Sequence, residues 1–147
     1  MTSSKDVEIT SRFFFKKHWS PDGGEIPAWS APFKIEGSNG LITHGNLPGC
    51  YAIYNDHDAL LYVGVGRSVK QGPYAENALD RRIRGHVYRV DKSSGTYVAR
   101  SPWKERGATH IRTIGLPQKF FYVSASLEEF LIHELKPPFN RIGGSKK

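Results

Sequence analysis

The stretch 49-GCYAIYNDHDALLYVGV-65 decides the fold of this chain. Two short runs of β-branched and aromatic residues flank Asn-Asp-His-Asp, a polar cluster typical of turns. The stretch therefore predicts a β-hairpin. If the four polar residues form the loop, Tyr54 pairs with Ala59. Tyr51 then lies opposite Tyr62 on one face of the ribbon, where the two phenols are neighbours.

The segment 76-ENALDRRIRGHVYRV-90 predicts the first helix of this region. Its apolar residues recur at every fourth position and form one helical face: Leu79, Ile83 and Val87. Arg82 and His86 are also four residues apart, so they lie one turn from each other on an adjoining face. Arg89 would follow one turn further along. These basic side chains are expected to point toward one spot.

The region 108–125 predicts one or two further strands after a polar connection. Ser126 and Glu129 then have the spacing of a capping box, which predicts a helix that ends before Pro137. Glu128 would lie in the first turn of that helix. Since the helix dipole favours acidic residues there, Glu128 alone indicates ordinary capping more than chemistry.

Residues 1–46 have a different composition from the rest of the chain. Several prolines and glycines interrupt short aromatic pieces, which predicts an irregular N-terminal extension. Its aromatic residues suit a packing layer over a small core better than a base-stacking platform. We therefore expect an α+β domain at residues 47–147, with residues 1–46 packed on it or flanking it.

Length and charge limit the classes of function that the chain can have. Its 147 residues suit one domain with a hydrophobic core, and no apolar run approaches the roughly 20 residues of a membrane span. Lysine and arginine number 21 against 14 acidic residues, which favours a polyanionic partner, with nucleic acid first. The N-terminus shows no export signal, and the single cysteine, Cys50, excludes an internal disulfide or a cysteine cluster for zinc. We therefore expect a cytoplasmic protein that does not enter a membrane.

The order of several motifs along the chain indicates a specific chemistry, although each residue alone has a simpler structural explanation. GCY at residues 49–51 and YVG at residues 62–64 resemble the two halves of the motif that names the GIY-YIG nuclease superfamily. In that family an arginine follows on the first helix, often with a histidine one turn later, as with Arg82 and His86. Its metal-binding glutamate precedes an asparagine by the same offset that separates Glu128 from Asn140. The resemblance covers residues 47–140.

The resemblance implies a three-stranded antiparallel sheet flanked by helices, and divalent-metal-dependent hydrolysis of DNA phosphodiester bonds. Glu128 would hold Mg²⁺, with Mn²⁺ as a substitute, while Arg82 would neutralise charge on the phosphate. Either Tyr51 or His86 would activate the water, and the sequence leaves this choice open. The implied catalytic residues are Tyr51, Tyr62, Arg82, His86, Glu128 and Asn140, of which Tyr62 orients the substrate or water and Asn140 braces the loop after the helix.

The chain departs from the family pattern after the second half of the motif. Many members have a lysine where this chain has Val65, so Arg67 or Lys70 would have to supply a second cation. The loop before Arg82 is also expanded, and we expect it to contact DNA. The residues predicted to bind nucleic acid are Arg67, Lys70, Arg81, Arg84 and Arg89.

Two other interpretations stay open beside a DNA endonuclease. One is a noncatalytic DNA-binding module on the same scaffold, and the other is a nuclease directed at RNA. The sequence also leaves open the site specificity, the biological role and the choice between a monomer and a homodimer. One active site cuts one strand, so a double-strand break would need a dimer or two successive nicks.

Overall fold

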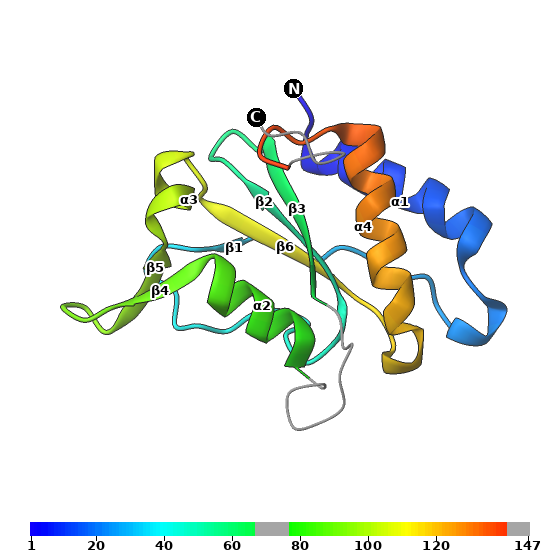
Figure 1. The fold of residues 1–147 in the computed structure, drawn as a ribbon, viewed down its shortest axis with the longest axis horizontal. Coiled ribbons are helices and arrows are strands. Elements are labelled where there is room, and N and C mark those ends of the chain that lie inside the picture. Colours follow the sequence, from blue (N-terminus) through cyan, green and yellow to red (C-terminus); the bar gives the residue numbers. More distant parts are fainter. Residues whose placement is uncertain (67–76, 141–147) are drawn as a thin grey trace.

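The computed structural model describes residues 1–66 and 77–140. A four-stranded antiparallel sheet in the order β1-β6-β2-β3 forms the centre, and a separate ribbon pairs β4 with β5 (Figure 1). The helices are α1 (Ser4–His18), α2 (Ala78–His86), α3 (Ser101–Glu105) and α4 (Phe121–Leu135). The strands are β1 (Phe33–Lys34), β2 (Gly49–Tyr54), β3 (Leu60–Gly66), β4 (Tyr88–Asp91), β5 (Thr96–Ala99) and β6 (His110–Gly115). Within the described ranges no helix combines the length and apolar character that a bilayer crossing requires.

The predicted α+β class is confirmed, but the predicted number of strands in the main sheet is wrong. The sheet has four strands because β1, from the N-terminal region, pairs with β6 through Phe33 and Lys34. A two-residue strand carries too little alternation to be detected in a sequence. It forms because β6 offers a free edge, whose backbone groups need partners.

Strand β2 lies inside the sheet and divides the core into two clusters. All six of its residues are buried, and Cys50 packs on one face while Tyr51 packs on the other. Helices α1 and α4 cover the Cys50 face, and α2 and α3 cover the Tyr51 face. Cys50 and Tyr51 are consecutive in β2, so the alternation of the strand puts their side chains in different clusters.

The hairpin is present, but its predicted register is wrong. Tyr51 lies opposite Gly64 and not opposite Tyr62. The Asn55 side chain accepts hydrogen bonds from two backbone amides of the turn, and Asp58 has a left-handed backbone with φ of 62°. This turn geometry shifts the pairing. Tyr62 becomes a diagonal neighbour of Tyr51 on the same face, and the two ring centroids lie 6.1 Å apart.

The predicted pair of Tyr54 with Ala59 is wrong for a related reason. Tyr54 pairs with Leu60, and the register shifts at this end of β2. Ala59 instead forms an isolated bridge with Ser3, and the Leu60 amide donates to the Thr2 carbonyl. The N-terminus of the chain therefore binds the hairpin next to its turn, which local sequence rules do not anticipate.

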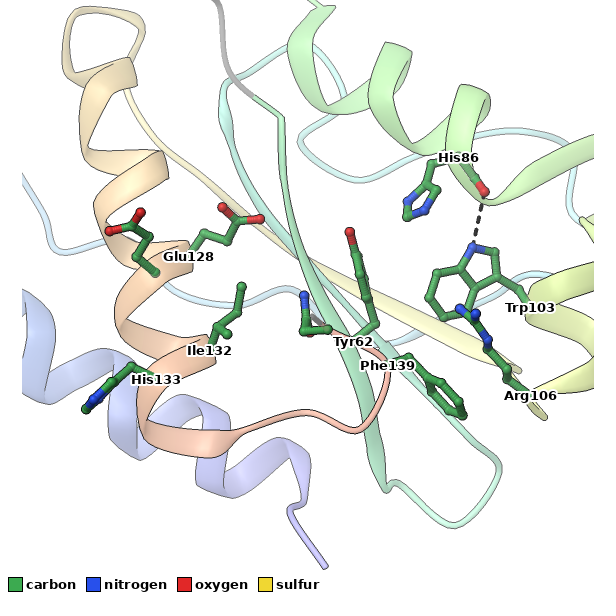
Figure 2. A pocket seen from close by; sticks show the side chains of 10 residues that line it. Tyr62, His86, Trp103, Arg106, Glu128, Ile132, His133 and Phe139 are labelled. Carbon is green, nitrogen blue, oxygen red and sulfur yellow. Dashed lines mark hydrogen bonds between the residues drawn. The ribbon is translucent and has the colours of Figure 1, made fainter. Parts of the chain in front are cut away.

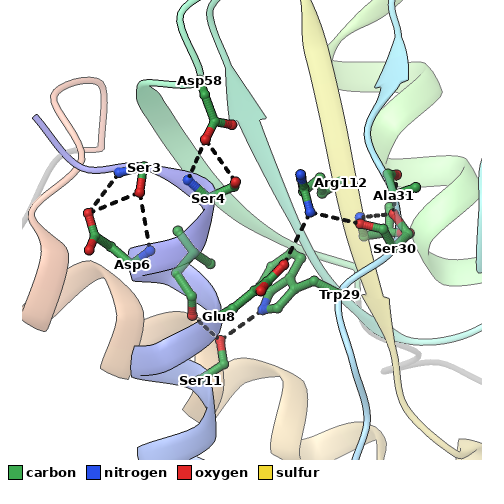
Figure 3. A network of polar contacts seen from close by, with 12 residues as sticks. Ser3, Ser4, Asp6, Glu8, Ser11, Trp29, Ser30, Ala31, Asp58 and Arg112 are labelled. Atoms are coloured by element: carbon green, nitrogen blue, oxygen red, sulfur yellow. Dashed lines mark hydrogen bonds and ion pairs between the residues drawn. The ribbon is translucent and has the colours of Figure 1, made fainter.

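The N-terminal region is not irregular throughout, because residues 4–18 form helix α1. Ser3 and Asp6 make a capping box at its start, and α1 packs against α4. A buried polar residue interrupts its apolar face: the Ser11 hydroxyl donates to the Val7 carbonyl and accepts from the Trp29 indole (Figure 3). Because Ser11 takes an inward position, the helical periodicity is hard to see in the sequence.

The boundaries of two predicted helices differ from those in the structure. Helix α2 ends at His86, so Arg89 lies on β4 and not on the helix. Helix α4 begins at Phe121, which makes residues 118–125 helical and leaves β6 as the strand of that region. Glu128 therefore lies in the middle of α4 and not in its first turn. Burial of Val123 and Ser124 against the sheet overrides the strand propensity of the aromatic run before them.

Candidate active site

A cleft of about 690 Å³ lies where α4, β3 and the ends of α2 and α3 meet (Figure 2). Four of the six predicted catalytic residues line it: Tyr62, His86, Glu128 and Asn140. The other two, Tyr51 and Arg82, adjoin it through contacts with Tyr62 and His86. The structure therefore brings together all six residues, which come from β2, β3, α2, α4 and the segment after α4.

Tyr51 and His86 form a hydrogen-bonded pair at the site. The Tyr51 hydroxyl lies 2.6 Å from His86 Nδ1, and Tyr51 is fully buried. Burial raises the pKa of Tyr51, and the nearby Tyr62 raises it further, against a smaller opposing effect of Arg82. The Tyr51 phenol is therefore protonated at neutral pH, and it does not line the cleft.

His86 is held in the neutral state by its surroundings. Burial lowers its pKa to about 4, and the positive charges of Arg82, Arg106 and Arg100 contribute to the shift. The Trp103 indole N–H donates to the His86 carbonyl over 3.1 Å, which fixes the end of α2. A neutral imidazole with one nitrogen next to Tyr51 can accept a proton on its other nitrogen.

The low pKa of His86 predicts a pH dependence of stability. Its pKa is about 4 in the folded protein and about 6.5 when unfolded, so between these values the unfolded chain binds more protons. The free energy of unfolding should fall as the pH decreases from 6.5 to 4, by about 1–2 kcal/mol after allowance for partial solvent screening.

Urea denaturation at several pH values can measure this contribution in the protein and in His86→Gln. Carboxylates also titrate in this range, so the difference between the two proteins isolates His86. The expected result is a smaller loss of stability toward pH 4 in His86→Gln. Parallel curves for the two proteins would contradict the assigned pKa.

Arg82 brings a positive charge next to the two tyrosines. Burial would lower its pKa, but coulombic attraction and hydrogen bonding with Tyr51 and Tyr62 raise it overall. Arg82 is itself solvent-exposed, so its guanidinium is also accessible to a substrate. The predicted neighbourhood of Arg82 and His86 agrees with the structure, because the charge of Arg82 helps to lower the pKa of His86.

Position 64, the last residue of the YVG half of the motif, has no room for a side chain. A Cβ atom built on Gly64 would overlap the ring of Tyr51, its cross-strand partner. The ring therefore lies across the Gly64 backbone, and the absence of a side chain there lets Tyr51 reach His86. Gly66 has a related role, since a Cβ there would meet the backbone of α2.

Glu128 lies on the α4 wall of the cleft beside Glu129 (Figure 2). It is partly buried, and its negative charge contributes to raising the pKa of Cys50 and of Tyr51, after the larger effect of burial. Residues 1–66 and 77–140 contain no group of three or more His, Cys, Asp or Glu that could hold a metal ion. A single carboxylate fits Mg²⁺, which keeps several waters and takes other ligands from a phosphate.

Asn140 connects the segment after α4 to β3, the outer strand of the sheet. Its side-chain carbonyl accepts from the Val63 amide and its side-chain amide donates to the Val63 carbonyl, each over 2.9 Å. The Phe139 amide also donates to the Leu61 carbonyl over 3.0 Å. The geometry agrees with a brace, because these bonds tie the segment that follows Glu128's helix to the strand that carries Tyr62.

The structure adds cleft residues that the sequence did not indicate. Trp103 and Arg106 from the α3 region, with Phe139, form one wall, and Glu129 lies next to Glu128. The sequence predicts a polar connection at residues 91–107, where the structure has β5 and α3. A tryptophan in a polar segment was the available signal, but it indicates burial and not which site the residue faces.

The residues predicted to bind nucleic acid have different environments. Arg81 and Arg89 are exposed, on α2 and β4 respectively. Arg84 instead supports the fold, since it bonds Asp80 over 2.9 Å and the Gly40 carbonyl over 2.5 Å. Its prediction as a nucleic-acid ligand therefore has no support in the geometry. Arg67, Lys70 and the expanded loop lie outside the described residues.

Comparison of the chain with protein-family models, with curated proteins and with solved structures finds no match. The function of the cleft must therefore be inferred from the chemistry of its own residues. Its defining features are a half-buried His86 bonded to the buried Tyr51, an arginine beside two tyrosines, and a carboxylate on the opposite wall.

Proposed function

We propose that this chain is a divalent-metal-dependent DNA endonuclease of the GIY-YIG type, which hydrolyses phosphodiester bonds in the cleft. One observation carries the proposal: Tyr62, His86 and Glu128 line a single cleft. Tyr51 and Arg82 adjoin this cleft through contacts with Tyr62 and His86. Side chains from β2, β3, α2 and α4 come together there, in the combination that the resemblance implies.

The charges of the cleft support a phosphate substrate that is bound together with a metal ion. Arg82, Arg100 and Arg106 lie close enough to His86 to lower its pKa. Glu128 and Glu129 lie on the α4 wall of the same cleft. A purely cationic cleft would suit any anion, whereas cations with carboxylates nearby suit an anion bridged by a divalent cation. The net charge of +7 is also consistent with a polyanionic substrate.

Glu128 would hold the divalent ion, which supplies Lewis-acid stabilisation of the phosphate and of the leaving oxygen. The guanidinium of Arg82 would donate to a non-bridging phosphate oxygen and stabilise the charge that develops in the transition state. Tyr62 would orient the phosphate or the attacking water by hydrogen bonding.

His86 is the better of the two candidates for the general base. It lines the cleft, whereas Tyr51 is fully buried and the pKa of its phenol is raised. The proposed role requires the tautomer in which Nδ1–H donates to the Tyr51 oxygen, because Nε2 is then the nitrogen that takes the proton from water. An incoming phosphate would offset the arginine charges and raise the pKa of His86 from about 4. Tyr51 is then a positioning residue that fixes the imidazole.

Tyr51→Phe should therefore lower kcat for DNA cleavage by about a hundred-fold and leave KM nearly unchanged, because the ring still fills its site but no longer orients His86. The matched control is Tyr54→Phe, on the same strand. The buried Tyr54 hydroxyl makes no hydrogen bond with the residues that the structure describes. Steady-state cleavage of a labelled duplex measures both variants. Equal activity in the two would refute the positioning role.

Incubation of the purified protein with supercoiled plasmid and Mg²⁺ tests the proposed function. Nicked or linear plasmid is the expected product, and discrete fragments would indicate site specificity. Tight DNA binding without cleavage in either Mg²⁺ or Mn²⁺ would favour the noncatalytic module instead. Preferential cleavage of a matched RNA would favour an RNA-directed nuclease.

A further inference from the structure

Arg106 occupies the end of the cleft opposite α4, held by two aromatic rings. Its guanidinium carbon lies 4.8 Å from the centre of the Trp103 ring and 4.6 Å from that of Phe139 (Figure 2). We propose that Arg106 binds a phosphate of the substrate strand other than the one that is cut. This inference rests on the proposed function and adds a second anchoring point for the strand.

The positive charge of Arg106 is not neutralised by an acidic side chain in the described structure. The partly buried arginines Arg112 and Arg84 do have such partners, since Arg112 lies 3.2 Å from Glu8 and Arg84 lies 2.9 Å from Asp80. Among residues 1–66 and 77–140, the Arg106 side chain has ring contacts but no hydrogen bond or ion pair. Ring contacts position a cation without cancelling its charge, so its N–H groups can bind an anion.

The two rings that hold Arg106 are themselves fixed to the catalytic cluster. Trp103 is 2% exposed and donates its indole N–H to the His86 carbonyl. Phe139 is tied to β3 by its backbone bond to Leu61, next to the Asn140 brace. Arg106 is therefore preorganised relative to His86, although it lies on the surface. A preorganised arginine loses less conformational entropy when it binds a phosphate.

Arg106 and Glu128 lie at opposite ends of the cleft (Figure 2). The cleft runs from Glu128 on α4, past Tyr62, to Arg106 (Figure 2), and its volume of about 690 Å³ exceeds what one phosphate needs. A nucleic-acid strand carries one phosphate per nucleotide, so a strand with one phosphate at Glu128 can place another phosphate at Arg106. The charge of Arg106 reaches His86, since it contributes to lowering the pKa of that residue.

The alternative is that Arg106 is only a structural link between α3 and the segment that contains Phe139. The two roles make different predictions about charge. A structural link depends on the shape of the guanidinium and its ring contacts, whereas a phosphate ligand contributes one released counterion to the salt dependence of binding. Substitutions that separate charge from shape therefore distinguish them.

The test measures equilibrium binding of the full chain to a labelled DNA duplex in EDTA, where no cleavage interferes, over a series of salt concentrations. Arg106→Gln should weaken binding by about 10-fold or more and reduce the slope of log K against log salt by about 0.9. Arg106→Lys keeps the charge, so its slope should stay near that of the parent protein. The control is Arg12→Gln on α1, which is exposed and does not line this cleft.

Equal affinities and slopes for Arg106→Gln and Arg12→Gln would overturn the proposal, and so would a slope in Arg106→Lys as low as that in Arg106→Gln. If Arg106→Gln does not fold, the slope of Arg106→Lys decides: an unchanged slope supports a phosphate contact and a reduced slope contradicts it. Cleavage by the unsubstituted protein is assayed separately. A failure to cleave contradicts the endonuclease, while the binding series still reports on Arg106.

Discussion

Replacement of Glu128 by alanine is expected to lower the rate of DNA cleavage by about a thousand-fold or more, while the protein stays folded. Glu128 is partly buried on the cleft wall of α4, where its charge reaches the buried Tyr51. If it holds the metal ion, its loss removes the Lewis acid from the reaction. A thousand-fold loss corresponds to about 4 kcal/mol of transition-state stabilisation.

The neighbouring carboxylates of α4 supply the controls. Glu129 lines the same cleft but is exposed, and Glu134 lies on the same helix outside the cleft, 3.2 Å from His133. Glu134→Ala should retain full activity, and Glu129→Ala should lose much less than Glu128→Ala. Plasmid nicking and circular dichroism measure activity and fold in parallel. Full activity in folded Glu128→Ala would exclude the metal-binding role, and a larger loss in Glu129→Ala would assign that role to Glu129.

Gly49→Ala is expected to give the largest loss of stability, about 4 kcal/mol or more. Gly49 opens β2 and pairs with both Gly66 on β3 and Gly115 on β6. Its φ is 156°, and a Cβ built on it would overlap the carbonyl oxygen of Ile114. That oxygen belongs to the backbone of the adjacent strand, so the clash cannot be relieved by rotation of a side chain. The sheet would have to separate at the start of its central hairpin.

Gly107→Ala is the matched control for this prediction. Gly107 also has positive φ, at 81°, but a Cβ there would meet nothing within 4 Å. It should lose only the cost of the left-handed backbone, about 1–2 kcal/mol. Urea denaturation of both variants measures the difference. Similar losses in the two would show that the close approach of β2 and β6 at Gly49 relaxes easily, and that the steric explanation is wrong.

The sequence predicted which residues belong to the candidate site better than it predicted how they are arranged. Tyr51 and Tyr62 are neighbours as expected, but through a diagonal relation and not as a directly opposed pair. The turn decided this, because the Asn55 side chain and the left-handed Asp58 changed the register. Such side-chain bonds within a turn change which residues pair across the strands, while Tyr51 and Tyr62 stay on the same side of the sheet.

Sequence alone determined the α+β class and the central hairpin, which depend on local patterns, namely apolar periodicity and turn composition, that act over a few residues. The list of candidate site residues came from the order of motifs along the chain and from the family resemblance that this order carries. Only the tertiary structure decided the fourth strand, helix α1, the start of α4 and the wall of Trp103, Arg106 and Phe139.

These features depend on contacts between segments that are distant in the chain. Strand β1 exists because β6 has an edge to pair with. Arg106 is held by two aromatic rings from distant parts of the chain, Trp103 on α3 and Phe139 in the segment after α4. The free energy of such contacts comes from burial and hydrogen bonding that form only when the segments meet. Local patterns such as the capping box of α1 are too weak to reveal these features without the contacts that the folded chain makes.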